Sequence, residues 1–170
     1  DFGILVTVGT GVICLSRNEK GQTMRMAGKG HEEGDKGSGY WIGKQAITNL
    51  ALNESSIVGD KHFEEIMDIF LESVSENNFK MALENIQKTK ESVRIIASLA
   101  VSIIKLAKTG NTVALSVVQE ATHAVANYII SLTDELNYSK KHIVLAGNGS
   151  VIRNDFFRDS LNDELRFQFP

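Results

Sequence analysis

Three short glycine clusters contain the residues of this chain that could bind a ligand. The first is Gly9, Thr10 and Gly11, the second spans residues 28–38, and the third spans residues 146–150. In the first cluster, two glycines allow a tight turn whose backbone N–H groups can point at an anion, and the Thr10 hydroxyl adds a donor. An ordinary hairpin turn explains the same residues, so both interpretations stay open for this cluster alone.

The second cluster, residues 28–38, is dense in glycine and charge. Asp35 follows a glycine here, and its carboxylate could accept hydrogen bonds from a polyol or hold a metal. His31, Glu32 and Glu33 have the side-chain types of metal ligands, but adjacent residues on a strand point apart and no second histidine follows at ligand spacing. We therefore predict no metal site, and a solvated charged loop is the alternative to a polyol site.

The third cluster, residues 146–150, reads A-G-N-G-S and lies between an apolar run and a helical pattern. A glycine turn between a strand and a helix N-terminus can bind a nucleotide, although many such connections contain glycine for structural reasons alone. None of the three clusters ends in Gly-Lys-Ser/Thr, so none is a Walker A loop. None has the dinucleotide pattern with its acidic residue about 20 positions further on.

The elements that must position these clusters alternate between strands and helices. Apolar runs predict strands at residues 4–8, 12–15, 22–26, 143–146 and 165–169. Helical periodicity predicts helices at residues 40–52, 79–86, 92–108, 112–136 and 151–161, and one more that begins after an N-cap at Asp60. The order βββα, helical insert, αβαβ predicts an α/β domain with a mixed sheet. We expect one domain over residues 1–170, with the helical insertion at about 54–110.

Composition narrows the classes of function. The net charge is −3, which gives no electrostatic reason to expect nucleic acid as a partner. No apolar run approaches the roughly 20 residues of a membrane helix, so we expect no membrane partner. The one cysteine, Cys14, can form no internal disulfide and suits a reducing compartment, which favours a cytoplasmic protein.

The clusters are more specific together, in their order along the chain, than singly. G-T-G at 9–11 is followed by G-x-G-H-x-x-G-D-x-G-S-G-Y-W-I-G at 28–43, by I-A-S-L-A at 96–100 and by L-A-G-N-G-S at 145–150. This succession resembles the family of N-acetylglucosamine kinases and the related BadF/BadG/BcrA/BcrD-type ATPases, within the actin and hexokinase superfamily. The resemblance covers almost all of the chain and implies the C-terminal lobe of such an ATPase, with a ribonuclease H-like fold.

The resemblance also implies residue roles, with ATP and Mg²⁺ as cofactors and an amino sugar as substrate. The positions that match ATP contacts are Gly9, Thr10 and Gly11 for the β- and γ-phosphates, Ala97 and Ser98 for the adenosine pocket, and Gly147, Asn148 and Gly149 for the adenosine motif. The positions that match the sugar loop are Gly28, Lys29, Gly30 and Asp35.

Four positions depart from the family pattern. Val12 replaces the usual serine after G-T-G, and Asn148 interrupts the usual glycine pair of the adenosine motif. Lys29 replaces an aromatic residue in the sugar loop, and Lys36 replaces the glutamate that usually follows the sugar-loop aspartate. The two lysines could favour an acidic substituent on the sugar.

The family's first phosphate loop and its general-base aspartate have no match in this sequence. We expect both in an N-terminal lobe, so this chain alone should bind nucleotide poorly and catalyse nothing. The intact protein is predicted to be an ATP-dependent hexosamine kinase. Two alternatives are an ATPase activator of the acyl-CoA dehydratase type, which would hold an iron–sulfur cluster through cysteines, and a sugar or nucleotide sensor without turnover. The amphipathic helices between Asp60 and Lys108 could support a homodimer.

Overall fold

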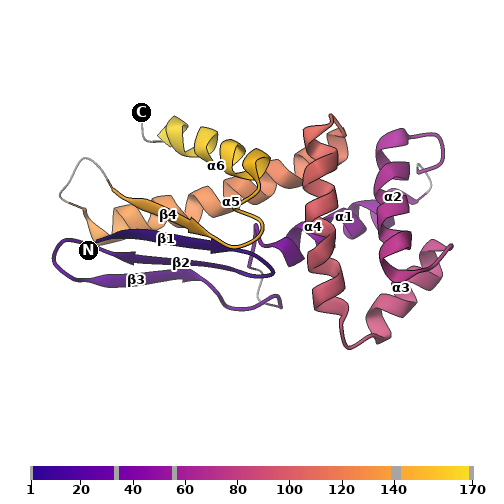
Figure 1. The fold of residues 1–170 in the computed structure, drawn as a ribbon, viewed down its shortest axis with the longest axis horizontal. Helices are drawn as coiled ribbons and strands as arrows, with labels where there is room; N and C mark the ends of the chain where they lie inside the picture. Colours follow the sequence, from indigo (N-terminus) through magenta and orange to yellow (C-terminus); the bar gives the residue numbers. More distant parts are fainter. Residues whose placement is uncertain (1, 33–34, 55–56, 139–142, 169–170) are drawn as a thin grey trace.

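The computed structural model describes residues 2–32, 35–54, 57–138 and 143–168. Its sheet has four strands in the order β3-β2-β1-β4 (Figure 1). The strands are β1 (Gly3–Val8), β2 (Val12–Arg17), β3 (Thr23–Ala27) and β4 (Leu145–Asn148). β1, β2 and β3 form an antiparallel meander, whereas β4 pairs in parallel with β1, so the sheet is mixed as predicted.

Six helices complete the described fold. They are α1 (Gly39–Leu52), α2 (Lys61–Val74), α3 (Phe79–Lys88), α4 (Ser92–Lys108), α5 (Thr112–Leu136) and α6 (Asp155–Gln168). α5 runs along one face of the sheet and α6 packs on α5, while α4 packs against α1 and α2 and α3 lie beyond α4, away from the sheet (Figure 1). No helix of the described residues is long and apolar enough to cross a membrane.

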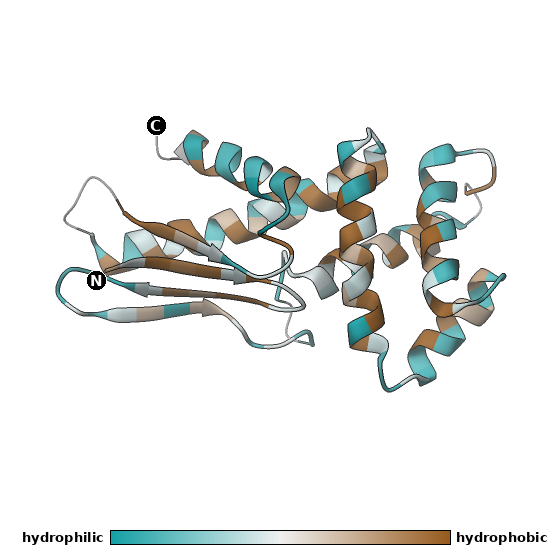
Figure 2. Cartoon of the chain, in the orientation of Figure 1, coloured by the Kyte–Doolittle hydropathy of each residue, from teal (hydrophilic) through white to brown (hydrophobic). Residues whose placement is uncertain are grey.

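The sheet buries one of its faces. Val6, Val8 and Cys14 are fully buried on the face that meets α5, as the alternation of side chains along a strand requires. The opposite face carries Leu5 and Leu15, each 42% exposed, and the apolar colouring of the central strands is visible in Figure 2. α1 and α4 pack so closely that a Cβ on Gly43 would lie 1.9 Å from the carbonyl oxygen of Ile96. Only glycine fits there, and this contact joins α4, with α2 and α3, to α1, the helix that reaches the sheet.

Most predicted elements are confirmed, and helices 92–108 and 112–136 have the predicted bounds. The Asp60 carboxylate accepts a hydrogen bond from the His62 amide and so caps α2 as predicted. The predicted strand 165–169 is wrong, because α6 continues to residue 168. Residue 169 lies outside the described residues. The predicted helix 151–161 begins late, because Asn154 accepts hydrogen bonds from the amides of Phe156 and Phe157 and starts α6 after it.

The error at 165–169 has a simple physical cause. Leu165 and Phe167 alternate with polar residues and suggest a strand, but Leu165 also continues the four-residue spacing of Phe157 and Leu161. Phe157 and Leu161 are buried in the core, whereas Phe167 is 88% exposed. The helical period therefore describes the buried side chains, and the period of two does not.

Candidate functional site

The first glycine cluster forms the tip of the β1–β2 hairpin, and the N-terminus of α1 holds it in place. The Gly39 amide donates to the carbonyl of Gly9 at 2.7 Å, and the Tyr40 amide donates to the carbonyl of Thr10 at 3.1 Å. The Ser38 hydroxyl caps the same helix by accepting from the Trp41 amide. The carbonyls of the hairpin tip thus satisfy amides in the first turn of α1 that no helical carbonyl could reach.

This arrangement fixes where the amides of the tip point. In a trans peptide unit the C=O and the following N–H point in opposite directions. Because the carbonyls of Gly9 and Thr10 face α1, the N–H groups of Thr10 and Gly11 face away from it. Both residues are exposed, and no hydrogen bond joins either amide to another described residue. Two adjacent free N–H groups and the Thr10 hydroxyl therefore form a small surface that fits an anion.

The third cluster lies directly beside this tip. The amides of Val151 and Ile152 both donate to the carbonyl of Val8, the last residue of β1. Gly149 has φ of +103°, and a Cβ there would lie 2.3 Å from the same carbonyl oxygen, so the turn after β4 requires glycine. A Cβ on Gly9 would lie 3.8 Å from the Ser150 hydroxyl. The hairpin tip and the A-G-N-G-S turn consequently form one continuous edge at the ends of the parallel strands β1 and β4.

The helix α4 brings Ala97 to this edge but turns Ser98 away from it. A Cβ on Gly39 would lie 2.9 Å from the carbonyl oxygen of Gly9 and 3.3 Å from that of Ala97, so Gly39 is the point where the hairpin and α4 meet. The Ser98 hydroxyl donates back to the carbonyl of Ile95, and its side chain lines a groove with residues of α2. Of the two positions predicted to line an adenosine pocket, the structure brings only Ala97 to the other glycine clusters.

The second cluster places its carboxylate against the hairpin tip. Asp35 is 7% exposed, and one of its carboxylate oxygens accepts from the Lys29 amide at 2.9 Å. The other oxygen lies 3.2 Å from the place where a Cβ on Gly11 would be. The carbonyl of Asp35 accepts from the Ser38 amide at 3.1 Å, which ties the loop to the cap of α1. The predicted sugar loop and the predicted phosphate turn are thus neighbours.

Two cations flank Asp35 in the chain. Lys29 and Lys36 are both exposed, and within the described part of the chain neither ammonium forms an ion pair.

Burial raises the pKa of Tyr128, a hydrogen bond with the Lys36 backbone opposes that shift, and the Asp35 carboxylate adds to it. His31 packs edge-on against Tyr40 with 5.0 Å between the ring centroids.

Metal ligation by this chain finds no support in the described residues. Among them, no three histidine, cysteine, aspartate or glutamate side chains lie close enough together to hold a metal ion. Glu33, whose side-chain type suggested a ligand, lies outside the described residues.

Two features of the site escaped the sequence analysis. Gly39 was assigned no role, although it contacts both the hairpin and α4. Arg153 lies outside the three glycine clusters, yet its guanidinium donates to the side-chain oxygen of Asn148 at 2.8 Å and orients that amide. Arg153 lies just before α6, and no pattern in the sequence indicates its contact with Asn148. No signal in the sequence alone could locate Gly39.

The fold is an α/β lobe of the actin and hexokinase type, with its glycine turns gathered at one edge of a mixed sheet. The BadF/BadG/BcrA/BcrD ATPase family matches residues 1–169, so the chain belongs to this family. An N-acetylmuramic acid/N-acetylglucosamine kinase of Clostridium acetobutylicum is 32% identical over 171 residues, which are 99% of this chain and 54% of that protein. An N-acetyl-D-glucosamine kinase of Dictyostelium discoideum is 26% identical over 173 residues, again 99% of this chain and 53% of that protein.

Solved structures agree on the fold. A crystal structure from Chromobacterium violaceum, provisionally assigned as an N-acetylglucosamine kinase, superposes with a TM-score of 0.74 at 20% identity. One from Porphyromonas gingivalis with the same provisional assignment gives 0.71 at 19% identity. Each comparison covers 99% of this chain and 53% of the solved chain. The chain therefore spans about half the length of the relatives that it matches.

Proposed function

We propose that this chain is the lobe of an ATP-dependent amino-sugar kinase that holds the terminal phosphates of ATP and orients the sugar. One observation carries the proposal: the free amides of Thr10 and Gly11 and the buried carboxylate of Asp35 lie side by side at the N-terminus of α1. A kinase must hold the transferred phosphoryl group next to the accepting hydroxyl, because phosphoryl transfer depends mainly on positioning and charge stabilisation.

Each group has a role that fits its chemistry. The amides and hydroxyl of the hairpin tip would donate to the β- and γ-phosphates, while Gly147, Asn148 and Gly149 would approach the nucleoside through the backbone. Asp35, as an acceptor held in one orientation by the Lys29 amide, would accept hydrogen bonds from sugar hydroxyls. The general base is proposed to come from the part of the protein that the relatives have in addition to this half.

The residues present fit ATP, because Thr10, Gly11, Gly147 and Asn148 in the turns that would face it are exposed and leave room for the nucleotide. Mg²⁺, bound to the phosphates, would neutralise their charge during transfer.

The ammonium groups of Lys29 and Lys36, which form no ion pair with another described residue, favour an amino sugar with an acidic substituent. The Lys29 amide donates a hydrogen bond to Asp35, so the backbone that carries the Lys29 side chain lies next to the carboxylate that would bind the sugar. A carboxylate on a neighbouring sugar atom would pair with such a cation. The Clostridium relative, named for both N-acetylmuramic acid and N-acetylglucosamine, supports this choice.

The test uses the intact protein, in which this chain is joined to the half that the relatives have in addition. ADP release from Mg-ATP is measured with N-acetylglucosamine, N-acetylmuramic acid, glucosamine, glucose and no sugar. We expect release that depends on an amino sugar. Asp35→Asn keeps the shape of the side chain but removes its charge, and should lower kcat/KM for the sugar about 10- to 100-fold. Asp68→Asn, an exposed acid on α2, is the matched control and should change nothing.

Substitution of the two lysines addresses the choice of sugar. Lys29→Met and Lys36→Met should each lower the preference for N-acetylmuramic acid over N-acetylglucosamine about twofold to fivefold, the range for exposed ion pairs. An unchanged preference in both variants would remove the acidic sugar from the proposal and leave the kinase intact. ADP release that is independent of sugar would instead favour the activator-type ATPase, and binding without release would favour a sensor.

One observation weighs against the activator. Cys14 is fully buried in the sheet, and burial raises the pKa of its thiol to about 12. A cluster ligand must be a thiolate that iron can reach, so Cys14 does not fit that role.

A further inference from the structure

The loop that follows β3 turns through residues in the left-handed region of backbone conformation. Ala27 has φ of 58°, Gly28 has φ of 70° and Gly30 has φ of 93°. Glycine adopts these values freely, but Ala27 carries a Cβ that disfavours them. A left-handed alanine needs contacts elsewhere that hold it in that conformation.

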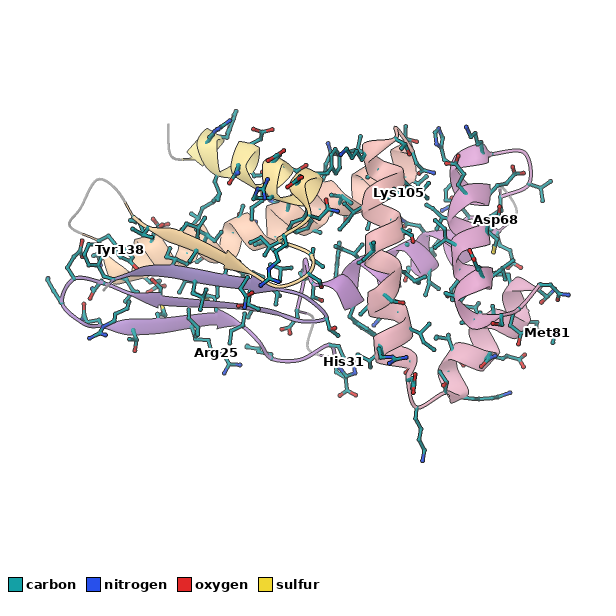
Figure 3. All side chains as sticks on the ribbon, in the orientation of Figure 1. Arg25, His31, Asp68, Met81, Lys105 and Tyr138 are labelled. Atoms are coloured by element: carbon teal, nitrogen blue, oxygen red, sulfur yellow. The ribbon has the colours of Figure 1, made fainter. Side chains whose placement is uncertain are left out.

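Arg25 on β3 supplies those contacts. Its Nε donates to the carbonyl of Ala27 at 3.3 Å, and a terminal nitrogen of the same guanidinium donates to the carbonyl of Gly28. The side chain leaves β3 on the exposed face of the sheet, since Arg25 pairs in register with Leu15 (Figure 3). One planar fork therefore holds two successive carbonyls of the loop.

The peptide unit between Gly28 and Lys29 connects this fork to Asp35. Its C=O accepts from Arg25, and its N–H donates to the Asp35 carboxylate at 2.9 Å. The two bonds lie at opposite ends of one rigid plane, so fixing the carbonyl also fixes the direction of the N–H. A cation at the carbonyl also polarises the unit and strengthens the bond that its N–H makes.

We propose that Arg25 is a positioning residue for the sugar: through this one peptide unit it sets the orientation of the Asp35 carboxylate. The inference rests on the proposed function and deepens it, because it says what keeps the sugar-binding acceptor in place. Among the described residues, the Arg25 guanidinium bonds the carbonyls of Ala27 and Gly28 and makes no hydrogen bond to the hairpin tip. Loss of the Arg25 side chain should therefore weaken binding of the sugar and leave binding of the nucleotide unaffected.

The experiment compares Arg25→Met, Arg25→Lys and Arg17→Met in the intact protein. Arg17 is an exposed arginine on the same face of the sheet, at the other end of β2, and serves as the control. Arg25→Met should raise KM for the amino sugar about tenfold, while KM for ATP changes less than about twofold. Arg25→Lys should fall in between, because an ammonium can replace only part of the planar fork. Amide hydrogen exchange across residues 26–31 should become about tenfold faster in Arg25→Met and stay unchanged in Arg17→Met.

Equal KM values in Arg25→Met and Arg17→Met would overturn the inference, as would parallel changes in KM for sugar and ATP. If Arg25→Met does not fold, Arg25→Lys decides, and wild-type values for both KM and amide exchange would overturn it. If the wild-type protein shows no sugar-dependent ADP release, the proposed function fails. Amide exchange then tests the link from Arg25 to the loop by itself: faster exchange supports it and unchanged exchange refutes it.

Discussion

Gly39→Ala tests whether the hairpin tip and α4 meet at one residue that must lack a side chain. Two effects oppose each other in this variant. Alanine is favoured over glycine in a helix by up to about 1 kcal/mol, which alone would stabilise α1. Against this, the new Cβ would lie 2.9 Å from the carbonyl oxygen of Gly9 and 3.3 Å from that of Ala97. Both neighbours are backbone atoms of packed elements, and forcing extra atoms into such a place costs about 1–3 kcal/mol.

The steric cost should exceed the gain in helix propensity, so the free energy of unfolding should fall by about 1–2 kcal/mol and Tm by roughly 2–8 °C. The hairpin tip is the more easily displaced neighbour, so the affinity for ATP should fall while that for the sugar changes little. Calorimetry and ATP titration of the intact protein measure both effects. Gly147→Ala is the matched control for stability, because the three atoms nearest its Cβ all belong to the Ile152 side chain, with the terminal Cδ1 at 3.2 Å, and none is backbone. A Gly39→Ala protein as stable as the wild type, with unchanged ATP affinity, would refute the role of Gly39.

Three further perturbations test the site and the core. Gly149→Ala should cost about 2–4 kcal/mol in urea unfolding, through left-handed strain and the clash with β1, whereas Gly30→Ala, with nothing within 4 Å, should show the strain alone. With its pKa at about 12, the Cys14 thiol should react with iodoacetamide at pH 8 at least about a thousandfold more slowly than after unfolding. Because the folded state keeps the thiol proton, the contribution of Cys14 to stability is complete below about pH 8.5 and is lost as the pH rises toward 12. Asn111→Ala should cost about 2–3 kcal/mol by chemical denaturation, since this buried N-cap of α5 also bonds across to α2, while the exposed N-cap Asn78→Ala should cost about 1 kcal/mol.

The secondary structure was predictable wherever a single periodicity, helical or strand-like, described both the apolar residues in the sequence and the side chains buried in the fold. The helix at 92–108 was found because its apolar residues repeat at helical spacing and a basic last turn precedes Gly110. The end of the chain was mispredicted because residues 165–168 satisfy two periods at once, and only the packing of Phe157 and Leu161 distinguishes them. Local sequence does not contain that packing.

The site was predictable as a set of segments but not as a geometry. The three glycine clusters and the segment around Ala97 do converge, in agreement with the family pattern. Ser98, next in sequence, faces α2, because successive residues on a helix point about 100° apart. The support provided by Arg25 and Arg153 was not predictable, since a guanidinium bonded to a backbone carbonyl, as in Arg25, or to a side-chain amide oxygen, as in Arg153, leaves no pattern in the sequence. The assigned roles in binding remain predictions for the experiments above.

The geometry of α1 bears on how such a lobe can act in transfer. The Ser38 amide bonds the carbonyl of Asp35, and the next two amides bond the carbonyls of Gly9 and Thr10. Three successive residues of one helix start thus fix both the proposed sugar acceptor and the proposed phosphate turn. A helix start cannot change the distance between its own successive amides, so this lobe would set the spacing of sugar and phosphate by itself. In the proposed kinase, closure of a second lobe would then need only to add the base and the remaining phosphate contacts.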